Sequence, residues 1–323
     1  AFTRLLNDDS NEYHVPGARV VGAYPGGSNL FSKSRDRVQG FTDELRDAYG
    51  VRIYDDIPAL VADVDAILLE SVDGRQHLEQ LEQIVGAFAG RPRPVFVDKP
   101  FATSTVDARQ MLQLAAQTGT PVLSSSSLRY SAGIVGLAGA DATSSEPDAP
   151  SGRVLSCEAF GPAAILEDYP GLFWYGIHSA EMLYAYMGVG CESVRCLPQH
   201  ELDVIVGQWQ DGRVGVIRGT RFKGGQFGCI VHTDAGTRCG LAQSTPPGYY
   251  GLMQVVIEFL KSGVSPIDVQ ETFEIVSFLE AANWSRDHAG QITRLNGAAW
   301  QYFRKKLPFI TRSALKAGLT FRL

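Results

Sequence analysis

Cysteine is scarce in this sequence of 323 residues, and no two cysteines have the C-x-x-C spacing of zinc sites and redox motifs. Their number is odd, and they stand at Cys157, Cys191, Cys196, Cys229 and Cys239. A complete disulfide framework is therefore not indicated, and we expect no metal site. A reducing compartment fits this cysteine usage best, so we expect a cytoplasmic protein.

Long apolar runs and blocks of like charge are also missing. No apolar stretch approaches the length needed to cross a bilayer, which argues against membrane insertion. The net charge of -6 is spread along the chain, which argues against nucleic acid as a partner. A small molecule is the expected ligand. The remaining composition, 45% apolar and 20% charged, is that of a globular protein, and the length suits two domains.

The first part of the chain alternates apolar runs with helical patterns. The runs ARVVGAY, VRIY, DAILLE, PVFVDK and PVLSSS look covered on both faces, as the strands of a parallel sheet are. This alternation predicts a doubly wound α/β domain. Beyond 138–152, strand-like runs joined by Asp-Gly and Ala-Gly turns predict an α+β domain with a large, mostly antiparallel sheet. We place the two domains at 1–130 and 131–323.

A charged pair closes one of the buried strands. In VFVDKPFATS, Asp98 and Lys99 follow three strand-forming residues, and Pro100 keeps Lys99 in an extended conformation. Ligands of open parallel sheets bind beyond the carboxyl ends of the strands, so both side chains are candidates for a site there. The alternative is an ordinary surface lysine paired with Asp98.

Two histidines are further candidates. His178 begins the helical stretch HSAEMLYAYMG, and Glu181 follows three residues later on the same face, where a carboxylate could fix the imidazole tautomer. Amid aromatic neighbours, His178 could equally be a core residue whose hydrogen bonds are satisfied. His77 follows a strand end and a turn, and could face the cleft or be a first-turn helix residue.

Taken in order, several segments resemble one family, the Gfo/Idh/MocA oxidoreductases that are typified by glucose-fructose oxidoreductase and inositol dehydrogenase. DAILLESVDGRQH stands where the family has a strand, a turn and a histidine, and VFVDKPFATS where it has Glu-Lys-Pro. VLSSSSLRYSAG, GIHSAEMLYAYMG and FLEAANWS are similar to its later motifs. The resemblance covers nearly the whole chain and implies a Rossmann-type domain followed by an α+β domain.

The resemblance also implies roles for individual residues. Lys99 matches the lysine that contacts nicotinamide and substrate, and His178 the histidine assigned to proton transfer. Arg129, His77 and Asp73 match positions near the cofactor, which would be NAD or NADP. Members of the family commonly form dimers or tetramers through the exposed face of the second domain's sheet.

Some positions depart from the family pattern. Trp174 stands where family dehydrogenases commonly have an aspartate, four residues before the catalytic histidine, so the substrate or the proton relay differs. Asp98, also expected near the cofactor, replaces the usual glutamate by a shorter carboxylate.

The start of the chain departs further. A dinucleotide fold begins with a strand and a glycine-rich turn that cradles the pyrophosphate, whereas this chain opens inside what should be the first helix. We therefore expect the first strand and the phosphate loop to precede Ala1, or else a domain that no longer binds cofactor normally. Tyr24 and Ser28 end the next strand where NAD enzymes carry an acid. Lys33, Arg35 and Arg37 follow them, which leans slightly toward NADP.

The main hypothesis is an NAD(P)-dependent oxidoreductase that moves a hydride between nicotinamide and a sugar, polyol or related hydroxy compound. His178 would be the acid or base, helped by Glu181, and Lys99 would hydrogen-bond the reacting oxygen. One alternative is a lyase or glycosidase that recycles its cofactor on the same scaffold. The other is a sensor or interaction protein that keeps the fold without chemistry.

Overall fold

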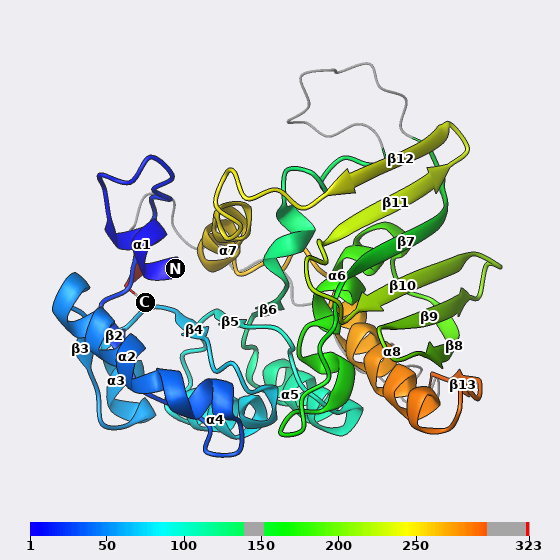
Figure 1. The fold of residues 1–323 in the computed structure, drawn as a ribbon. Coiled ribbons are helices and arrows are strands. Elements are labelled where there is room, and N and C mark those ends of the chain that lie inside the picture. The colour runs from blue at the N-terminus through cyan, green and yellow to red at the C-terminus, as the bar shows by residue number, and fades with distance from the viewer. Residues whose placement is uncertain (139–151, 296–320, 323) are drawn as a thin grey trace. The chain divides into compact units, whose positions relative to one another are not determined.

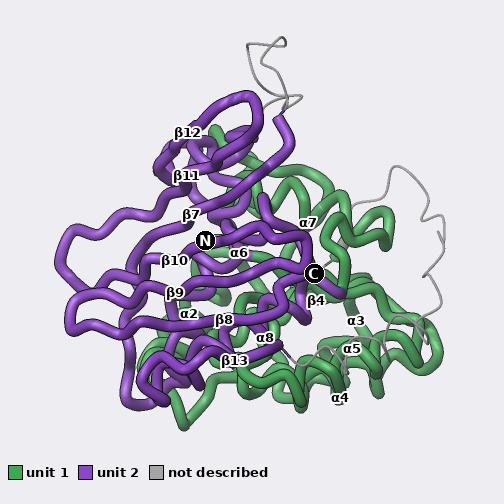
Figure 2. The backbone as a smooth tube through the Cα atoms, turned by 90° about the vertical axis from the view of Figure 1, so that its right-hand side faces the viewer, with its two compact units in different colours: residues 1–125, 249–269, 306–323 green, residues 126–248, 270–305 purple. Residues whose placement is uncertain are grey.

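The computed structural model describes residues 1–138, 152–295 and 321–322. The chain forms two compact units, coloured separately in Figure 2. Unit 1 comprises Ala1–Ser125, Tyr249–Val269 and Lys306–Leu323, and unit 2 comprises Ser126–Gly248 and Gln270–Lys305. The first break falls near the expected boundary at residue 130, but two later segments return to unit 1.

Parallel strands form the centre of unit 1, as the apolar runs predict. β4 (Ile67–Leu69), β5 (Val95–Val97) and β6 (Val122–Ser124) make one parallel sheet, and β5 and β6 are buried throughout. β2 (Gly22–Ala23) pairs in parallel with β3 (Arg52–Ile53). Strands covered on both faces need apolar residues at every position, which is why their sequences do not alternate.

Helices connect these strands, and their ends follow local sequence signals. The Asp56 carboxylate caps the helix that begins at Ile57 by accepting a hydrogen bond from the Ala59 N–H. The Ser104 hydroxyl caps the helix that begins at Thr105 by accepting one from the Asp107 N–H. Gly119 ends a helix in the left-handed conformation that glycine adopts without strain. The helices between the strands are α2 (Ser32–Tyr49), α3 (Ile57–Asp63), α4 (His77–Gly86) and α5 (Thr105–Thr118).

A strand from the far end of the sequence lies between the two groups of parallel strands. β14 (Phe321–Arg322) pairs in parallel with β1 (Ala18–Arg19) on one side. On its other side, the Arg322 carbonyl accepts hydrogen bonds from the Asp65 and Ala66 N–H groups, just before β4. The Arg322 side chain also binds the Asp65 carboxylate. β14 thus bridges β1 and the segment that leads into β4.

An aromatic cluster explains why the segment 249–269 belongs to unit 1. α1 (Phe2–Asn7) places the Phe2 ring 5.0 Å from the ring of Tyr249, measured between centroids, and 6.3 Å from that of Phe96. Tyr13 and Tyr250 lie 5.5 Å apart in the same way. These edge-on contacts attach α7 (Tyr250–Ser262) to the parallel domain.

Unit 2 contains one sheet of seven strands in the order β12-β11-β7-β10-β9-β8-β13. All neighbours are antiparallel except β7 and β10, so the sheet is mixed and mostly antiparallel, as the turns predict. α6 (Gly176–Met187) and α8 (Val269–Asp287) lie along one face (Figure 1). The strands are β7 (Val154–Pro162), β8 (Cys191–Pro198), β9 (Leu202–Trp209), β10 (Val214–Thr220), β11 (Gly228–Thr233), β12 (Gly236–Leu241) and β13 (Thr293–Arg294).

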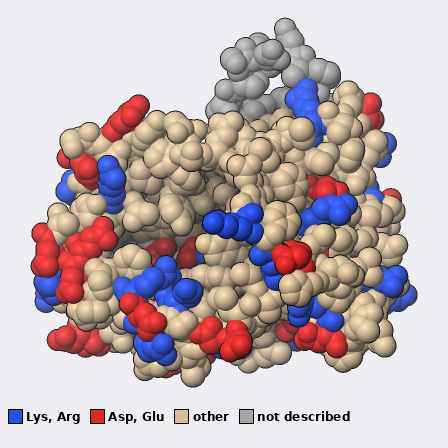
Figure 3. Space-filling model, in the orientation of Figure 1, with Lys and Arg blue, Asp and Glu red and all other residues tan. Residues whose placement is uncertain are grey.

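Several sequence expectations concern features of the whole chain. All five cysteines are free, and only Cys239 is exposed. Within the described ranges, no helix has the length and apolar character to cross a membrane, and no cluster of side chains has the makeup of a metal site. On the face drawn in Figure 3, basic and acidic side chains are interspersed.

Candidate active site

The Asp98 and Lys99 side chains lie at the carboxyl end of β5. The Lys99 Nζ is 3.6 Å from the Asp98 Oδ2, and the two side chains are only 13% and 15% exposed. The Asp98 N–H donates to the Leu69 carbonyl of β4, which fixes the strand end. An ion pair this buried is no ordinary surface contact. It provides a positioned ammonium group at the edge where parallel sheets bind ligands.

Glu70, which sequence reasoning missed, stands at the carboxyl end of β4. Burial in its surroundings and the nearby Asp98 charge raise the pKa of its carboxyl well above the usual value, and Lys99 opposes this shift. The residue itself is exposed, so water also reaches it. The sequence feature that could have indicated Glu70 is an acidic residue at the end of the apolar run DAILLE. Asp98 was selected on the same kind of feature.

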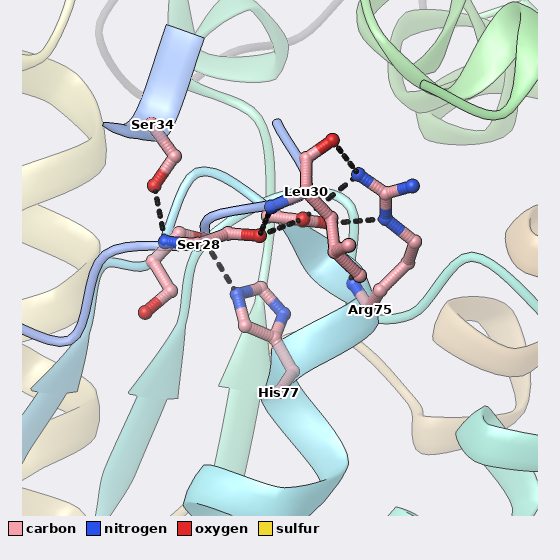
Figure 4. Close-up of polar contacts among 7 residues, drawn as sticks. Ser28, Leu30, Ser34, Arg75 and His77 are labelled. Carbon is pink, nitrogen blue, oxygen red and sulfur yellow. Dashed lines mark hydrogen bonds and ion pairs between the residues drawn. The ribbon is translucent and has the colours of Figure 1, made fainter. Parts of the chain in front are cut away.

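Ser28 and Asp73 are bound to each other. The Ser28 hydroxyl donates to the Asp73 Oδ2 over 2.6 Å, and the Arg75 Nε donates to Oδ1 over 2.8 Å (Figure 4). Burial alone would raise the pKa of Asp73, but the hydrogen bonds from Arg75 and Ser28 lower it overall. The ionised carboxylate therefore ties the loop after β2 to η1 (Gly74–Gln76).

His77 is fully buried at the start of α4. Its Nδ1 lies 3.1 Å from the Phe101 carbonyl oxygen and its Nε2 lies 2.7 Å from that of Ser71. The His77 ring is labelled in Figure 4. Burial lowers the pKa of the imidazole, against the effect of these hydrogen bonds. Both nitrogens thus face the protein's own backbone, as expected of a structural first-turn residue, and the cofactor role of His77 stays a prediction.

The loop after β2 is tightly packed. A Cβ added to Gly26 would lie 2.7 Å from the Gln80 Nε2, and one added to Gly27 would lie 3.0 Å from Val38. Tyr24 is 38% exposed at the end of the strand. The glycines therefore serve close packing against α2 and α4, while Tyr24 keeps an accessible ring.

His178 is oriented in unit 2 by a serine that the sequence did not single out. The Ser126 Oγ lies 2.7 Å from the His178 Nδ1 and also accepts a hydrogen bond from the Leu128 N–H. Ser126 immediately precedes η2 (Ser127–Tyr130), so a short turn holds its hydroxyl against α6. When Nδ1 carries its proton toward Ser126, Nε2 is the nitrogen that can take a proton from a substrate.

Glu181 and Arg129 form a buried ion pair. The Arg129 Nε is 3.0 Å from the Glu181 Oε2, and its second nitrogen Nη1 is 2.6 Å from the Glu271 Oε1. Burial is the main reason why the pKa of Glu181 is raised, although Arg129 lowers it and a hydrogen bond from the Ser126 N–H does too. Glu181 thus accepts a hydrogen bond from the backbone of Ser126, whose hydroxyl contacts His178. The Glu181 carboxylate is also paired with Arg129.

Trp174, at the position where the resemblance implies an aspartate, belongs to an aromatic cluster. Its ring lies 5.7 Å from that of Tyr169 and 5.3 Å from that of Tyr175. It lies between η3 (Gly171–Phe173) and Tyr175, the residue that precedes α6. The place of a polar catalytic partner is therefore taken by packed rings.

Comparison with known proteins agrees with this architecture. Residues 28–125 match the family GFO_IDH_MocA, described as an oxidoreductase family with an NAD-binding Rossmann fold. Within this segment the resemblance found in the motifs is confirmed, and the matching family is one of NAD-binding oxidoreductases. No curated protein sequence matches the chain.

Solved structures show the same fold at low identity. A probable dehydrogenase from Thermotoga maritima has 18% identity and a TM-score of 0.67, over 85% of this chain and 92% of that one. A putative myo-inositol dehydrogenase from Sinorhizobium meliloti has 16% identity and a TM-score of 0.66, over 86% and 92%. Scyllo-inositol dehydrogenase from Lactobacillus casei, with NAD(H) and scyllo-inositol bound, has 14% identity and a TM-score of 0.64, over 86% and 92%.

Proposed function

We propose that this protein transfers a hydride between a nicotinamide cofactor and a sugar, polyol or related hydroxy compound. The observation that carries the proposal is the Asp98–Lys99 pair, largely buried at the carboxyl end of β5 within the segment that matches the NAD-binding family. A positioned ammonium at that edge suits a reacting oxygen that becomes negative during the reaction.

Different residues of the chain have different roles in the proposed proton transfer. Oxidising a carbinol requires a base for the hydroxyl proton, while a bound nicotinamide supplies the hydride acceptor. His178 takes the proton at Nε2, because Ser126 engages Nδ1. Lys99 donates a hydrogen bond to the reacting oxygen. Arg129 and Glu181 keep the Ser126 turn in place.

Residues of unit 1 fit a dinucleotide at two places. Lys99, held by Asp98, would contact the nicotinamide end, and the accessible Tyr24 after β2 would face the adenosine end, with Ser28 behind it. Lys33 and Arg35 are exposed near the same strand end, which favours NADP slightly over NAD. Competitive binding of the two cofactors, followed by nicotinamide fluorescence, decides between them. Asp73, His77 and Arg129 stay predicted cofactor neighbours.

The test is release of reduced cofactor from a panel of cyclic and acyclic polyols and sugars. The unchanged protein is expected to reduce NAD or NADP with at least one of them, and Lys99→Met to lose about two orders of magnitude in turnover. Lys223→Met, which removes an exposed lysine of unit 2, is the matched control and should keep full activity. Equal turnover in Lys99→Met and Lys223→Met would refute the role of Lys99.

A second candidate function is supported by Trp174. With aromatic rings in place of the aspartate, a cofactor-recycling lyase or glycosidase would oxidise its substrate only transiently. Such an enzyme consumes substrate without accumulating reduced cofactor, whereas a dehydrogenase accumulates one equivalent per turnover. A protein that binds no nicotinamide nucleotide would instead be the third alternative, a sensor or interaction protein.

The proposal includes a homodimer or homotetramer in the cytoplasm. The face of the unit 2 sheet that points away from α6 exposes Val214 and keeps Val216 and Val204 half-buried, while Arg218 and Glu158 pair across strands there over 2.6 Å. A partly apolar sheet face with local charge pairs suits contact with a second copy. Light scattering after gel filtration measures the assembly.

A further inference from the structure

The rings beside His178 form a defined aromatic surface. Tyr175 and Phe227 lie nearly parallel, with an interplanar angle of 17° and centroids 6.2 Å apart. The imidazole stands edge-on to both, with its centroid 5.5 Å from that of Tyr175 and 5.3 Å from that of Phe227. Two aromatic faces therefore flank the proposed catalytic base within unit 2.

This surface differs from the aromatic core of the same unit. Tyr175 is 37% exposed, and Phe227 is half-buried, whereas the core rings of Tyr184 and Phe278 are at most 1% exposed. Large aromatic side chains left accessible beside a candidate catalytic residue are typical of a ligand site rather than of packing.

The backbone is shaped to hold these rings. Tyr175 is the residue directly before α6, and it is fixed by the Trp174 ring. On β7, Gly161 leaves room for Phe227, since a Cβ at that position would overlap the phenyl ring. The aromatic pair is therefore preset before any ligand arrives.

The chemistry of the surface selects the shape of a substrate. The face of an aromatic ring carries partial negative charge and attracts the weakly positive hydrogens of C–H bonds. A saturated ring whose hydroxyls are all equatorial presents such hydrogens on one whole face. An axial hydroxyl on that face would lose its water without gaining a hydrogen bond.

We infer that Tyr175 and Phe227 determine specificity by stacking a cyclic substrate whose stacked face carries only C–H bonds, with the hydroxyl to be oxidised directed at His178. The inference rests on the proposed function and deepens it by stating which stereochemistry the site accepts. Acyclic polyols, which cannot present a flat face, and rings with an axial hydroxyl on the stacked face bind more weakly.

The test measures binding without turnover, by saturation-transfer NMR with scyllo-inositol, myo-inositol and sorbitol as probes. We expect scyllo-inositol, which has only axial C–H bonds on both faces, and myo-inositol, which keeps one such face opposite its axial hydroxyl, to bind better than sorbitol, which has no flat face. Tyr175→Leu and Phe227→Leu, which keep apolar volume, should weaken scyllo-inositol binding about tenfold and remove the preference among the probes. Tyr175→Phe should keep both. Phe222→Ala, an exposed phenylalanine of the same loop, is the control.

The outcomes separate this inference from the proposed function. If binding selectivity depends on Tyr175 and Phe227 but the protein never reduces cofactor, the inference about the aromatic surface is supported and the proposed oxidoreductase function is refuted. Turnover with selectivity unchanged in the two leucine variants would uphold the reaction and overturn the inference. Equal binding of the three probes, or binding of none at millimolar concentration, would also overturn it.

Discussion

The Ser126 hydroxyl and the His178 imidazole are joined by a 2.7 Å contact between Oγ and Nδ1. This contact engages Nδ1 of the proposed base and leaves Nε2 for proton transfer. It also connects the base to a buried charge pair, because the Ser126 N–H donates to Glu181, which binds Arg129. The serine that precedes η2 is thus the link between the proposed proton chemistry and the buried charges of unit 2.

Removing that hydroxyl should affect catalysis more than folding. Ser126→Ala is expected to lower turnover about tenfold and to shift the acidic limb of the pH profile, because the imidazole loses a partner that fixes its tautomer. Ser126→Thr keeps a hydroxyl and should restore most of the activity. An unchanged pH profile in Ser126→Ala would show that the serine only caps the Leu128 N–H.

Lys99 and His178 should act in one chemical step. Single variants Lys99→Met and His178→Ala are each expected to lose about two orders of magnitude in turnover. If both groups serve the same proton transfer, the double variant should lose far less than the product of the single losses. Steady-state kinetics of the three variants measures this, and fully multiplicative losses would contradict a shared step.

The carboxyl of Glu70 should make stability depend on pH in a predictable direction. Because its pKa is raised in the folded protein, its favourable contribution is complete below the ordinary value of 4.5 and is lost as the pH rises through the raised value. Glu70→Gln should therefore be more stable than the unchanged protein near neutral pH and equally stable near the ordinary pKa. Solvent screening limits the gain to about 1 kcal/mol or less, measured by denaturant unfolding.

Arg129 should be important for the stability of unit 2. Arg129→Met leaves the carboxylates of Glu181 and Glu271 buried without their counter-charge, which should cost about 3 kcal/mol of unfolding free energy. Arg129→Lys keeps one charge and should cost less. Arg153→Met, at an exposed ion pair with Asp234, is the control and should change stability little. Similar losses in the Arg129→Met and Arg153→Met variants would contradict a buried network.

Much of the fold could be predicted because its elements have local signals. Strands β5 and β6 are buried on both faces, so they read as uninterrupted apolar runs, and the capping residues Ser104 and Gly119 mark the helix between them. β14 has no such signal, because its pairing residue Asp65 is 257 positions away from Arg322. No local pattern reports a partner at that distance.

In the candidate site, too, some residues have local sequence signals and others do not. Lys99 and His178 could be selected from strand ends and motif order. Ser126 could not, because it stands in the run SSSS and only the turn after β6 decides which serine meets the imidazole. The helical spacing from His178 to Glu181 predicts a direct partnership, which stays a prediction. The ion pair between Glu181 and Arg129 joins residues far apart in the sequence, so no local pattern indicates it.

The central position of β14 has a consequence for biosynthesis. β1 and the segment before β4 cannot form their hydrogen bonds to β14 until residue 322 has left the ribosome, after nearly every other part of the described chain has emerged. Contacts between distant segments form slowly and leave strand edges open to aggregation in the meantime. The strand edges that face β14 should therefore stay open until synthesis has passed residue 322.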